Sequence, residues 1–558
     1  MSKSWRLFAI VLFAASSIFA GIAGDRLLAL SGESEADLKL YTELLTAAHE
    51  NYGDEVLYRD LVYASVHGLL RTLDPHSTFL APEAYDSMRQ RQQGSFYGLG
   101  ILVSMRNGQL TVISPIEGTP AWRLGIRAGD VIAVIEDEPT DAMGLDEAVN
   151  KLKGPKDTQV NIQIVRRGLE KPLKLTITRA EIPQNTVRYA YMMADDTGYI
   201  RLTDFTRSTT REMRQALDKL KSEGMQRLIL DLRSNGGGLL DQTVAVSGFF
   251  VPEDSRIVET RGRVANSDQS FLADAGGEML DLPLVVLVNR GTASAAEILA
   301  GAIQDHDVGI IAGTPTWGKG LVQTVYNLSY RTAIALTTAK YYTPSGRLIQ
   351  RDYTSYYDYY TDFDGGGEDG PPEVSIDSPE FETDLGRKVY GGGGIAPDVL
   401  VELPDGPMSL QPLYVHNAFF NFAVDYHDRH HVENTEWAPE PGILDEFRQW
   451  LVAEEVVAKE DIEEIFSDPQ AESFTLRQIH SDVFTVAFDP EAAHRVLAEG
   501  DTQIQAAIDL FDQAAELLAE RDSLPGDRDG RFASALERRE LEKHGVALPP
   551  GKDESLPE

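Results

Sequence analysis

The chain contains no cysteine, and this absence removes several kinds of chemistry at once. None of its 558 residues can form a disulfide, a thiolate metal ligand or a cysteine nucleophile. Lipid attachment at cysteine is excluded for the same reason. Nothing in the sequence indicates a bound cofactor or a metal, so we expect an activity that needs neither.

Positive charge is also in short supply. Acidic residues number 88 and basic residues 51, which gives a formal net charge of −37. Such a surface repels nucleic acid and anionic membrane surfaces. We therefore expect protein partners and no nucleic acid.

Long hydrophobic runs are absent except at the start of the chain. Lys3 and Arg6 precede 18 uncharged, mostly apolar residues that end at Gly24. This pattern predicts an export signal over residues 1–24, either a cleaved signal peptide or a retained membrane anchor. We expect the rest of the chain in the cell envelope, in the periplasm or at the outer face of the cytoplasmic membrane.

The remaining sequence changes texture in a way that predicts four further regions. Apolar spacing of three and four residues predicts helices over 35–92, and short alternating runs predict a strand-rich module over 94–182. Alternating apolar strands and helices predict an α/β core over 187–404, with a polar, glycine-rich insertion at about 350–394. The acidic region 405–558 reads as mostly helical with a loose tail.

Histidine is scarce where a serine hydrolase would need it. Between residues 94 and 400 the only histidine is His306, twelve residues after Ser294 in "NRGTASAAEILAGAI". The two lie at opposite ends of one expected helix, about 18 Å apart by helical rise. Ser294 followed by Glu297 also fits a capping box, so capping and nucleophilic attack both remain open for Ser294.

Lys319 in "GTPTWGKG" is a second candidate for chemistry. The stretch resembles a phosphate-binding loop, but Gly320 replaces the Ser or Thr that would hold magnesium, and a strand pattern follows instead of a helix. A lysine in apolar surroundings loses its proton more readily and can act as a general base. Gln323 lies four residues on, about 13 Å away between Cα atoms in a straight strand, so contact with Lys319 requires folded side chains or a bend.

A glycine loop follows the predicted strand "RLILDL". Asn235 precedes Gly236, Gly237 and Gly238, and glycines here either permit positive φ in a tight turn or let backbone N–H groups approach an oxyanion. The N–H of Ala295, at the start of the helix after Ser294, could supply a second donor.

Seven motifs in order give the chain a family resemblance: "LDPHSTFL", "YGLGI", "DLRSNGGG", "NRGTASAAEI", "TWGKGLVQ", "YYTPSGRLIQ" and "GIAPDV". Together they resemble the carboxyl-terminal processing (tail-specific) proteases, and the likeness covers about residues 35–405. The resemblance implies a crotonase-like α/β core with an inserted PDZ domain. It makes Ser294 the nucleophile, Lys319 the general base and Gln323 the residue that positions the lysine, and it places the oxyanion donors at Gly237 and Ala295.

The PDZ expectation also has a physical basis. In "YGLGIL" the N–H groups of Leu99, Gly100 and Ile101 could hold a substrate's terminal carboxylate while the substrate adds as an extra strand; a plain hairpin loop is the alternative. Arg166 matches a position that gates the active site in relatives, although Arg167 is adjacent.

These observations predict an exported serine endopeptidase that recognises accessible protein C-termini through its PDZ domain. An inactive PDZ scaffold and a crotonase-type acyl-CoA enzyme are the rival interpretations. The region after 405 is expected to support a homo-oligomer or an adaptor.

Overall fold

The computed structural model describes residues 33–193, 196–274, 279–353, 379–404 and 406–523. The described residues form two compact units. One contains the chain up to Pro82 together with 324–336, and the other contains 83–323 and the chain from Thr337 onward. Each unit is described below by itself.

The first unit is built on two helices and a short strand. They are α2 (Glu33–Asn51), α3 (Tyr58–Arg71) and β1 (Thr78–Leu80). β1 pairs antiparallel with the first residues of β18 (Ala333–Tyr342). The turn before β1 is closed by Asp74, whose side chain accepts from the N–H groups of His76 and Ser77 at 2.8 and 2.7 Å.

The second unit begins with α4 (Pro82–Gln93) and then forms the expected strand-rich module. Its antiparallel sheet has the order β3-β4-β5-β7-β8, so β3 lies at an edge. Its core is aliphatic and includes Leu110, Ile132 and Ile162. The stretch "GLDEAVNKLKG" predicts one helix here, which is α6, and the structure has a second one, α5. The elements are β2 (Ser95–Gly98), β3 (Ile101–Arg106), β4 (Gln109–Pro115), α5 (Pro120–Arg123), β5 (Val131–Ile135), β6 (Glu138–Pro139), α6 (Leu145–Leu152), β7 (Gln159–Val165), β8 (Leu173–Thr178) and β9 (Ala180–Pro183).

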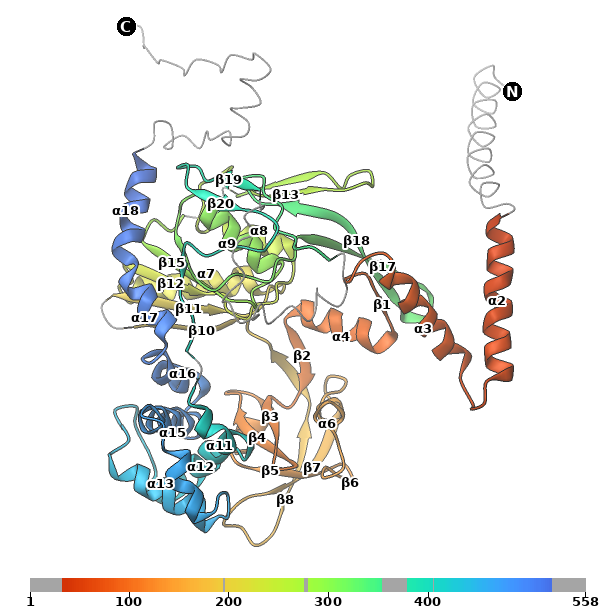
Figure 1. Ribbon diagram of the computed structural model, residues 1–558. Helices are drawn as coiled ribbons and strands as arrows, with labels where there is room; N and C mark the ends of the chain where they lie inside the picture. Colours follow the sequence, from red (N-terminus) through yellow and green to blue (C-terminus); the bar gives the residue numbers. More distant parts are fainter. Residues whose placement is uncertain (1–32, 194–195, 275–278, 354–378, 405, 524–558) are drawn as a thin grey trace, which may run out of the picture. The chain divides into compact units, whose positions relative to one another are not determined.

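The α/β core is a three-layer structure (Figure 1). Its six-stranded sheet has the order β10-β11-β12-β15-β16-β21 within the described residues, and all neighbours except β10 and β11 are parallel. Even-numbered side chains of β12 face one layer of helices, whereas Ile229 faces the other layer. The strands are β10 (Val187–Met192), β11 (Thr197–Leu202), β12 (Arg227–Asp231), β15 (Leu284–Val288), β16 (Ile310–Gly313) and β21 (Val399–Leu400).

The two helical layers come from distant parts of the chain. One layer is α7 (Thr209–Ser222), α8 (Leu240–Ser247) and α9 (Ala295–Asp305). The other is α17 (Thr502–Asp509) and α18 (Phe511–Asp522), which pack on the opposite face through Ile504, Phe511 and Leu517. The helical region predicted after 405 is therefore divided, because its last two helices complete the core.

Shorter elements surround the core. They are β13 (Arg256–Arg261), β14 (Gln269–Leu272), β17 (Leu321–Asn327), β19 (Glu380–Glu382) and β20 (Lys388–Tyr390), with a 3-10 turn at Ser329–Arg331. Two further 3-10 turns, Met408–Leu410 and Lys459–Asp461, pack with the C-terminal helices.

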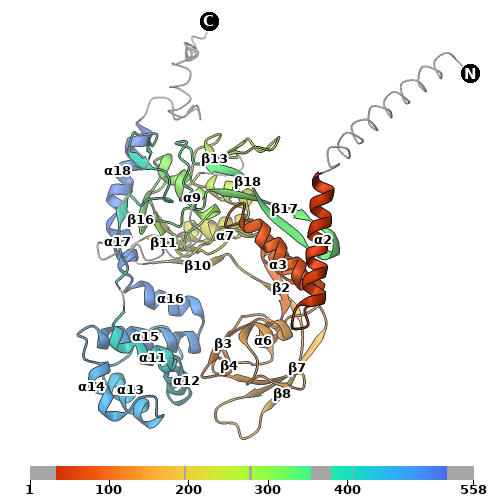
Figure 2. The same cartoon turned by 45° about the vertical axis from the view of Figure 1, so that its right-hand side comes forward.

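The remaining C-terminal helices form a bundle with its own aromatic core (Figure 2). Phe419 stacks on Phe447 with ring centroids 5.4 Å apart, and Phe422 meets Phe447 edge-on at 5.0 Å. The bundle helices are α11 (Gln411–Val415), α12 (Ala418–His430), α13 (Gly442–Ala453), α14 (Ile462–Ile465), α15 (Ala471–Ala487) and α16 (Pro490–Ala498).

The bundle contacts the strand-rich module closely. The Arg106 guanidinium lies 4.1 Å from the ring centroid of Phe420. Gly129 meets the side chain of Val424 so tightly that a Cβ on Gly129 would lie 2.7 Å from its Cγ1. Arg167 pairs with Asp425 at 2.9 Å. These contacts join the module to the bundle through packing as well as charge.

No helix among the described residues is both long and apolar enough to cross a membrane. The predicted signal or anchor at 1–24 lies outside the described residues, as do residues 354–378 of the predicted insertion and residues 524–558 of the predicted tail.

Candidate active site

Ser294 lies where strand β15 turns into helix α9. Its φ of +57° and ψ of −117° are unusual for a residue with a side chain, a conformation that costs about 1–3 kcal/mol and persists only when the surroundings impose it. Every residue of α9 is buried. Ser294 thus occupies the N-terminus of a fixed helix, where the partial positive charge favours a developing anion.

The loop before Ser294 is held against the glycine loop by a ladder of hydrogen bonds. The N–H of Ala293 donates to Asn235 O at 2.9 Å, and the hydroxyl of Thr292 donates to Leu232 O at 2.8 Å. Ser234 N donates to Asn289 Oδ1 at 2.7 Å. The two loops that the sequence marked separately are therefore one structural element.

Gly237 is the glycine that faces the serine. Its φ is +97°, and a Cβ there would lie 2.8 Å from Ala295 N and 2.9 Å from Ser294 Cβ, so only glycine fits. Within the described residues the N–H of Ala295 donates to no protein acceptor, but the N–H of Gly237 donates to Asn235 Oδ1 at 2.9 Å. An oxyanion role for Gly237 requires this bond to be released, and the assignment of both donors stays a prediction.

Lys319 and Gln323 meet through their side chains. Lys319 Nζ donates to Gln323 Oε1 at 3.3 Å, although four residues separate them. Gly318 has a φ of +86°, a bend that the sequence permits only because no side chain is present there. The half-buried Lys319 precedes β17, which is the strand that the sequence indicates after this loop.

Glu297 connects the serine to the lysine. Its carboxylate is fully buried and accepts four hydrogen bonds. Oε2 accepts from the N–H groups of Ser294 at 2.7 Å and Lys319 at 2.9 Å. Oε1 accepts from Gly318 N at 2.7 Å and the hydroxyl of Thr316 at 2.5 Å. The glutamate half of the expected capping box is formed, because Ser294 N donates to Glu297, whereas the N–H of Glu297 donates to the backbone oxygen of Ser294 at 2.9 Å. The same glutamate also fixes the backbone of the lysine loop.

Burial raises the pKa of Glu297 to about 7, although the donors from Thr316, Lys319, Gly318 and Ser294 act in the opposite direction. The carboxyl group therefore changes charge near neutral pH. A protonated oxygen keeps less capacity to accept, so one of the four donors then loses its partner.

Tyr341 is a second link that the sequence analysis did not assign. Its hydroxyl donates to Ser294 O at 3.0 Å and also lies against the carbonyl oxygen of Lys319. The side chain is almost fully buried. Tyr341 is the first residue of the family motif "YYTPSGRLIQ". Its place in that motif is the one sequence signal that could have indicated a role at the site.

His306 is not placed to serve Ser294. It caps the opposite end of α9, and its ring nitrogens lie 2.7 Å from Asp384 Oδ2 and 2.7 Å from Arg256 O. Both nitrogens are thus committed to structural contacts, which agrees with a base other than histidine.

Arg166 is engaged within the strand-rich module. Its guanidinium makes two bonds to the buried Asp130, at 2.7 and 2.8 Å, and a third to Gly125 O at 2.7 Å. The adjacent Arg167 is the one that leaves the module, through its pair with Asp425. The structure brings Arg166 into contact with none of Ser294, Lys319 and Gln323, so its gating role stays a prediction.

The predicted carboxylate loop precedes the edge strand β3. The carbonyl oxygens of Leu99 and Gly100 accept from Ala121 N at 3.0 Å and Ile116 N at 2.9 Å. In the part of the chain that the structure describes, the N–H groups of Leu99 and Gly100 donate to no protein atom. Ile101 opens β3. This arrangement has the donors and the free strand edge that peptide capture needs.

Replacing Glu297 by glutamine should slow the reaction of Ser294. The amide offers one accepting oxygen instead of two, so donors on one side of the group lose their acceptor, at about 1–3 kcal/mol each. We expect Glu297→Gln to lower the rate of Ser294 labelling by a fluorophosphonate probe at least roughly tenfold. Glu463→Gln, at an exposed position on α14, is the control, and an unchanged rate in Glu297→Gln would contradict the linking role.

The ionisation of Glu297 can be observed directly. In the infrared difference spectrum between the wild type and Glu297→Gln, we expect a protonated carboxyl band that disappears with a midpoint near pH 7. Because burial raises the folded-state pKa above the usual 4.5, proton binding stabilises the fold fully below pH 4.5, and this contribution is lost as the pH rises through about 7. A midpoint near 4.5 would show that burial does not control this group.

Comparison with known proteins agrees with this geometry. Residues 196–355 match Peptidase family S41, and residues 111–166 match a PDZ domain. The Carboxy-terminal-processing protease of Bartonella bacilliformis is 42% identical over 294 residues, covering 52% of this chain and 67% of that protein. The Carboxyl-terminal-processing protease of Synechocystis is 39% identical over 302 residues, covering 52% and 69%.

A third relative extends the match. The Carboxy-terminal processing protease CtpA of Bacillus subtilis is 32% identical over 362 residues, covering 63% of this chain and 76% of that protein. The chain belongs to peptidase family S41, the carboxyl-terminal processing serine proteases, and carries a PDZ domain.

Proposed function

We propose that this protein hydrolyses peptide bonds near protein C-termini with Ser294 as nucleophile, Lys319 as general base and Gln323 as the residue that orients the lysine. The observation that carries the proposal is the shared carboxylate of Glu297, which accepts from the backbone N–H groups of both Ser294 and Lys319. The contact of Lys319 Nζ with Gln323 Oε1 at 3.3 Å adds a partner for the amine.

The reaction follows from these positions. The neutral amine of Lys319 takes the hydroxyl proton as Ser294 Oγ attacks the carbonyl carbon of the substrate. The tetrahedral oxyanion forms at the N-terminus of α9, where the N–H of Ala295 has no other acceptor among the described residues and the helix dipole favours negative charge. The lysine then returns the proton to the leaving amine. In the second half of the reaction, Lys319 takes a proton from a water molecule, which attacks the acyl-enzyme and releases Ser294.

The PDZ domain supplies substrate capture in this proposal. The N–H groups of Leu99 and Gly100 hold the terminal carboxylate, and the last residues of the substrate extend the sheet along β3. The three-layer core, with its parallel strands and helices on both faces, is assigned to the crotonase-like fold on the same grounds as the family resemblance.

Substitution of the three polar residues tests the catalytic assignment. With a protein substrate that has a free, flexible C-terminus, we expect Ser294→Ala and Lys319→Ala to lose activity by roughly a thousandfold or more. Lys319→Arg should not restore it, because a guanidinium keeps its proton. Gln323→Ala should fall less, with a shifted pH profile.

The control for this series is Lys171→Ala, at an exposed position of the PDZ domain, which should remain fully active. Full proteolysis by Ser294→Ala would refute the mechanism. A wild type that binds tails but cleaves none would instead identify the inactive scaffold that the sequence left as an alternative.

We also propose that the protein acts outside the cytoplasmic membrane, because residues 1–24 have the charge and apolar pattern of an export signal. In a bacterial host, we expect the full chain in the periplasmic or membrane fraction and a chain starting after residue 24 in the cytosolic fraction. Recovery of the full chain from the cytosol would contradict export.

A further inference from the structure

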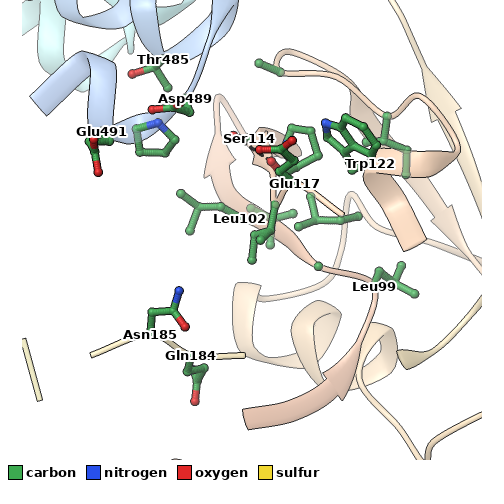
Figure 3. Close-up of a pocket in the computed structure, with 18 of the residues that line it drawn as sticks. Leu99, Leu102, Ser114, Glu117, Trp122, Gln184, Asn185, Thr485, Asp489 and Glu491 are labelled. Atoms are coloured by element: carbon green, nitrogen blue, oxygen red, sulfur yellow. Dashed lines mark hydrogen bonds between the residues drawn. The ribbon is translucent and has the colours of Figure 1, made fainter. Parts of the chain in front are cut away.

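A large cavity adjoins the tail-binding edge of the PDZ domain. It has a volume of about 1480 Å³ and is lined by the PDZ domain, by strands β10 and β11 of the core, and by the helical bundle. Figure 3 shows Leu102 and Ser114 of the PDZ domain on one side of this space and Thr485, Asp489 and Glu491 of the bundle across from them. The bundle thus provides part of the wall around the site that receives a tail.

The two faces of β3 have different neighbours. Ile101, Val103 and Met105 pack against the PDZ core. Leu102, which is 41% exposed, and Arg106 point to the opposite face by the alternation of a strand. Arg106 stacks on Phe420 of the bundle at 4.1 Å, so the outward face of β3 is turned toward the bundle.

A peptide that extends the sheet at β3 must follow the same alternation. When its terminal carboxylate lies at Leu99 and Gly100, its last side chain faces the groove beside Val149 and Leu152 of α6. Its penultimate side chain then points the other way, over the outward face of β3. In an isolated PDZ domain that side chain would face solvent, whereas in this chain residues of the bundle line the cavity on the side of β3 where it would lie.

Acidic residues line both sides of this space. Glu117, in the PDZ domain between β4 and α5, is exposed and has no ion-pair partner among the residues that the structure describes. Asp489 caps α16 by accepting from Ala492 N at 2.8 Å, and Glu491 pairs with Arg495 at 3.0 Å while remaining 36% exposed. The capping bond fixes Asp489 in place, so the negative charge at the start of α16 has a defined position.

Basic residues also line the cavity, at Arg91, Arg127, Lys153, Arg188 and Arg201. Lys153 follows α6 and approaches the carboxylate loop, since a Cβ on Gly98 would lie 3.8 Å from its Cγ. Arg201 belongs to the sheet and is paired with Asp231 at 2.7 Å. Arg127 lies close enough to His427 of α12 to lower the pKa of that histidine, although burial is its larger cause. Lys153 is thus the cation that lies near the carboxylate loop, while Asp489 and Glu491 lie across the cavity from β3.

We propose that the helical bundle forms a second wall of the tail-binding site and selects substrates with lysine or arginine as the penultimate residue. The residues that carry this selection are Asp489 and Glu491 of the bundle, together with Glu117 on the facing side of the PDZ domain. The inference rests on the proposed capture of C-terminal tails by the PDZ domain, and it adds the identity of the tail that binds best.

Peptide binding to the full chain tests the selection. The Ser294→Ala protein prevents cleavage, and the probes are fluorescent decapeptides with a free C-terminus that differ only in a penultimate Lys, Ala or Glu. By fluorescence anisotropy we expect Kd to increase in the order Lys, Ala, Glu, with about a fivefold to tenfold range at low salt that narrows at high salt. A lysine moved one residue inward should lose the preference, because that side chain faces the apolar groove.

Charge removal locates the effect. Glu117→Gln combined with Glu491→Gln, on the Ser294→Ala background, should reduce the ratio of the Glu and Lys peptide Kd values to about two or less. Asp489 is left intact because it caps α16. Glu463→Gln, outside the cavity, should leave the ratio unchanged.

The outcomes separate the two proposals. If none of the free-acid peptides binds better than its amidated counterpart, tail capture by the PDZ domain fails and the inference fails with it. If the free-acid peptides bind better but the Lys and Glu forms have equal affinities, tail capture stands and the selection by the bundle is wrong.

Discussion

The active site depends on one buried carboxylate with four donors. Because Glu297 accepts from Ser294, Thr316, Gly318 and Lys319, the loop that carries Ser294 and the loop that carries Lys319 share an acceptor. Neither backbone can shift without leaving a buried N–H unpaired. The unusual dihedral angles of Ser294 persist because this bond and the bond from Tyr341 fix the residue on both sides.

A second constraint extends from the glycine loop to the end of the described chain. Strand β12 ends at Asp231, a fully buried carboxylate that pairs with Arg233 at 2.7 Å. The guanidinium of Arg233 also donates to Asp501, the N-cap residue of α17, at 2.7 Å and to Gln503 of α17 at 2.9 Å. The start of the loop that contains Gly237 is therefore bonded to a helix more than 260 residues away in sequence, which makes α17 part of the catalytic core.

Features that depend on local residue spacing could be predicted from the sequence. The hydrogen-bond partner that each polar group selects could not. The serine at the start of a helix, the strand after Lys319 and the free edge of the PDZ sheet all follow from local patterns. The hydrogen bond from Gly237 to Asn235 Oδ1 does not, because residue types alone do not show which donor is occupied. The partner of Arg166 likewise does not follow from the sequence. Of two adjacent arginines, Arg166 binds Asp130 inside the PDZ domain and Arg167 binds Asp425 of the bundle.

The sequence also indicates that helices cover both faces of the core sheet. The strand "LVVLV" is apolar at every position, and the structure buries all five residues, which requires helices on both faces of the sheet. The stretch "AAIDLFDQAAELLAERD" is amphipathic, and it contains the whole of α18, which covers the second face. Periodicity shows that a helix has an apolar face, but it does not show which surface that face will cover.

The rigidity of α9 limits how this enzyme could be controlled. At the C-terminal end of the helix, Asp305 pairs with the fully buried Arg347 at 2.7 Å, and Asp307 pairs with Arg387 at 2.6 Å. These ion pairs and the burial of every α9 residue fix the helix, so Ser294 has little freedom to move toward or away from its partner. Control by a bound tail would then have to act on the lysine loop or on the position of the PDZ domain. The bundle contacts that domain through Val424 and Asp425, and it contacts the core through His494 of α16, whose Nδ1 lies 3.0 Å from the hydroxyl of Tyr191. It is therefore one route by which such a change could reach the core, beside the chain segment between β9 and β10 that joins the two directly.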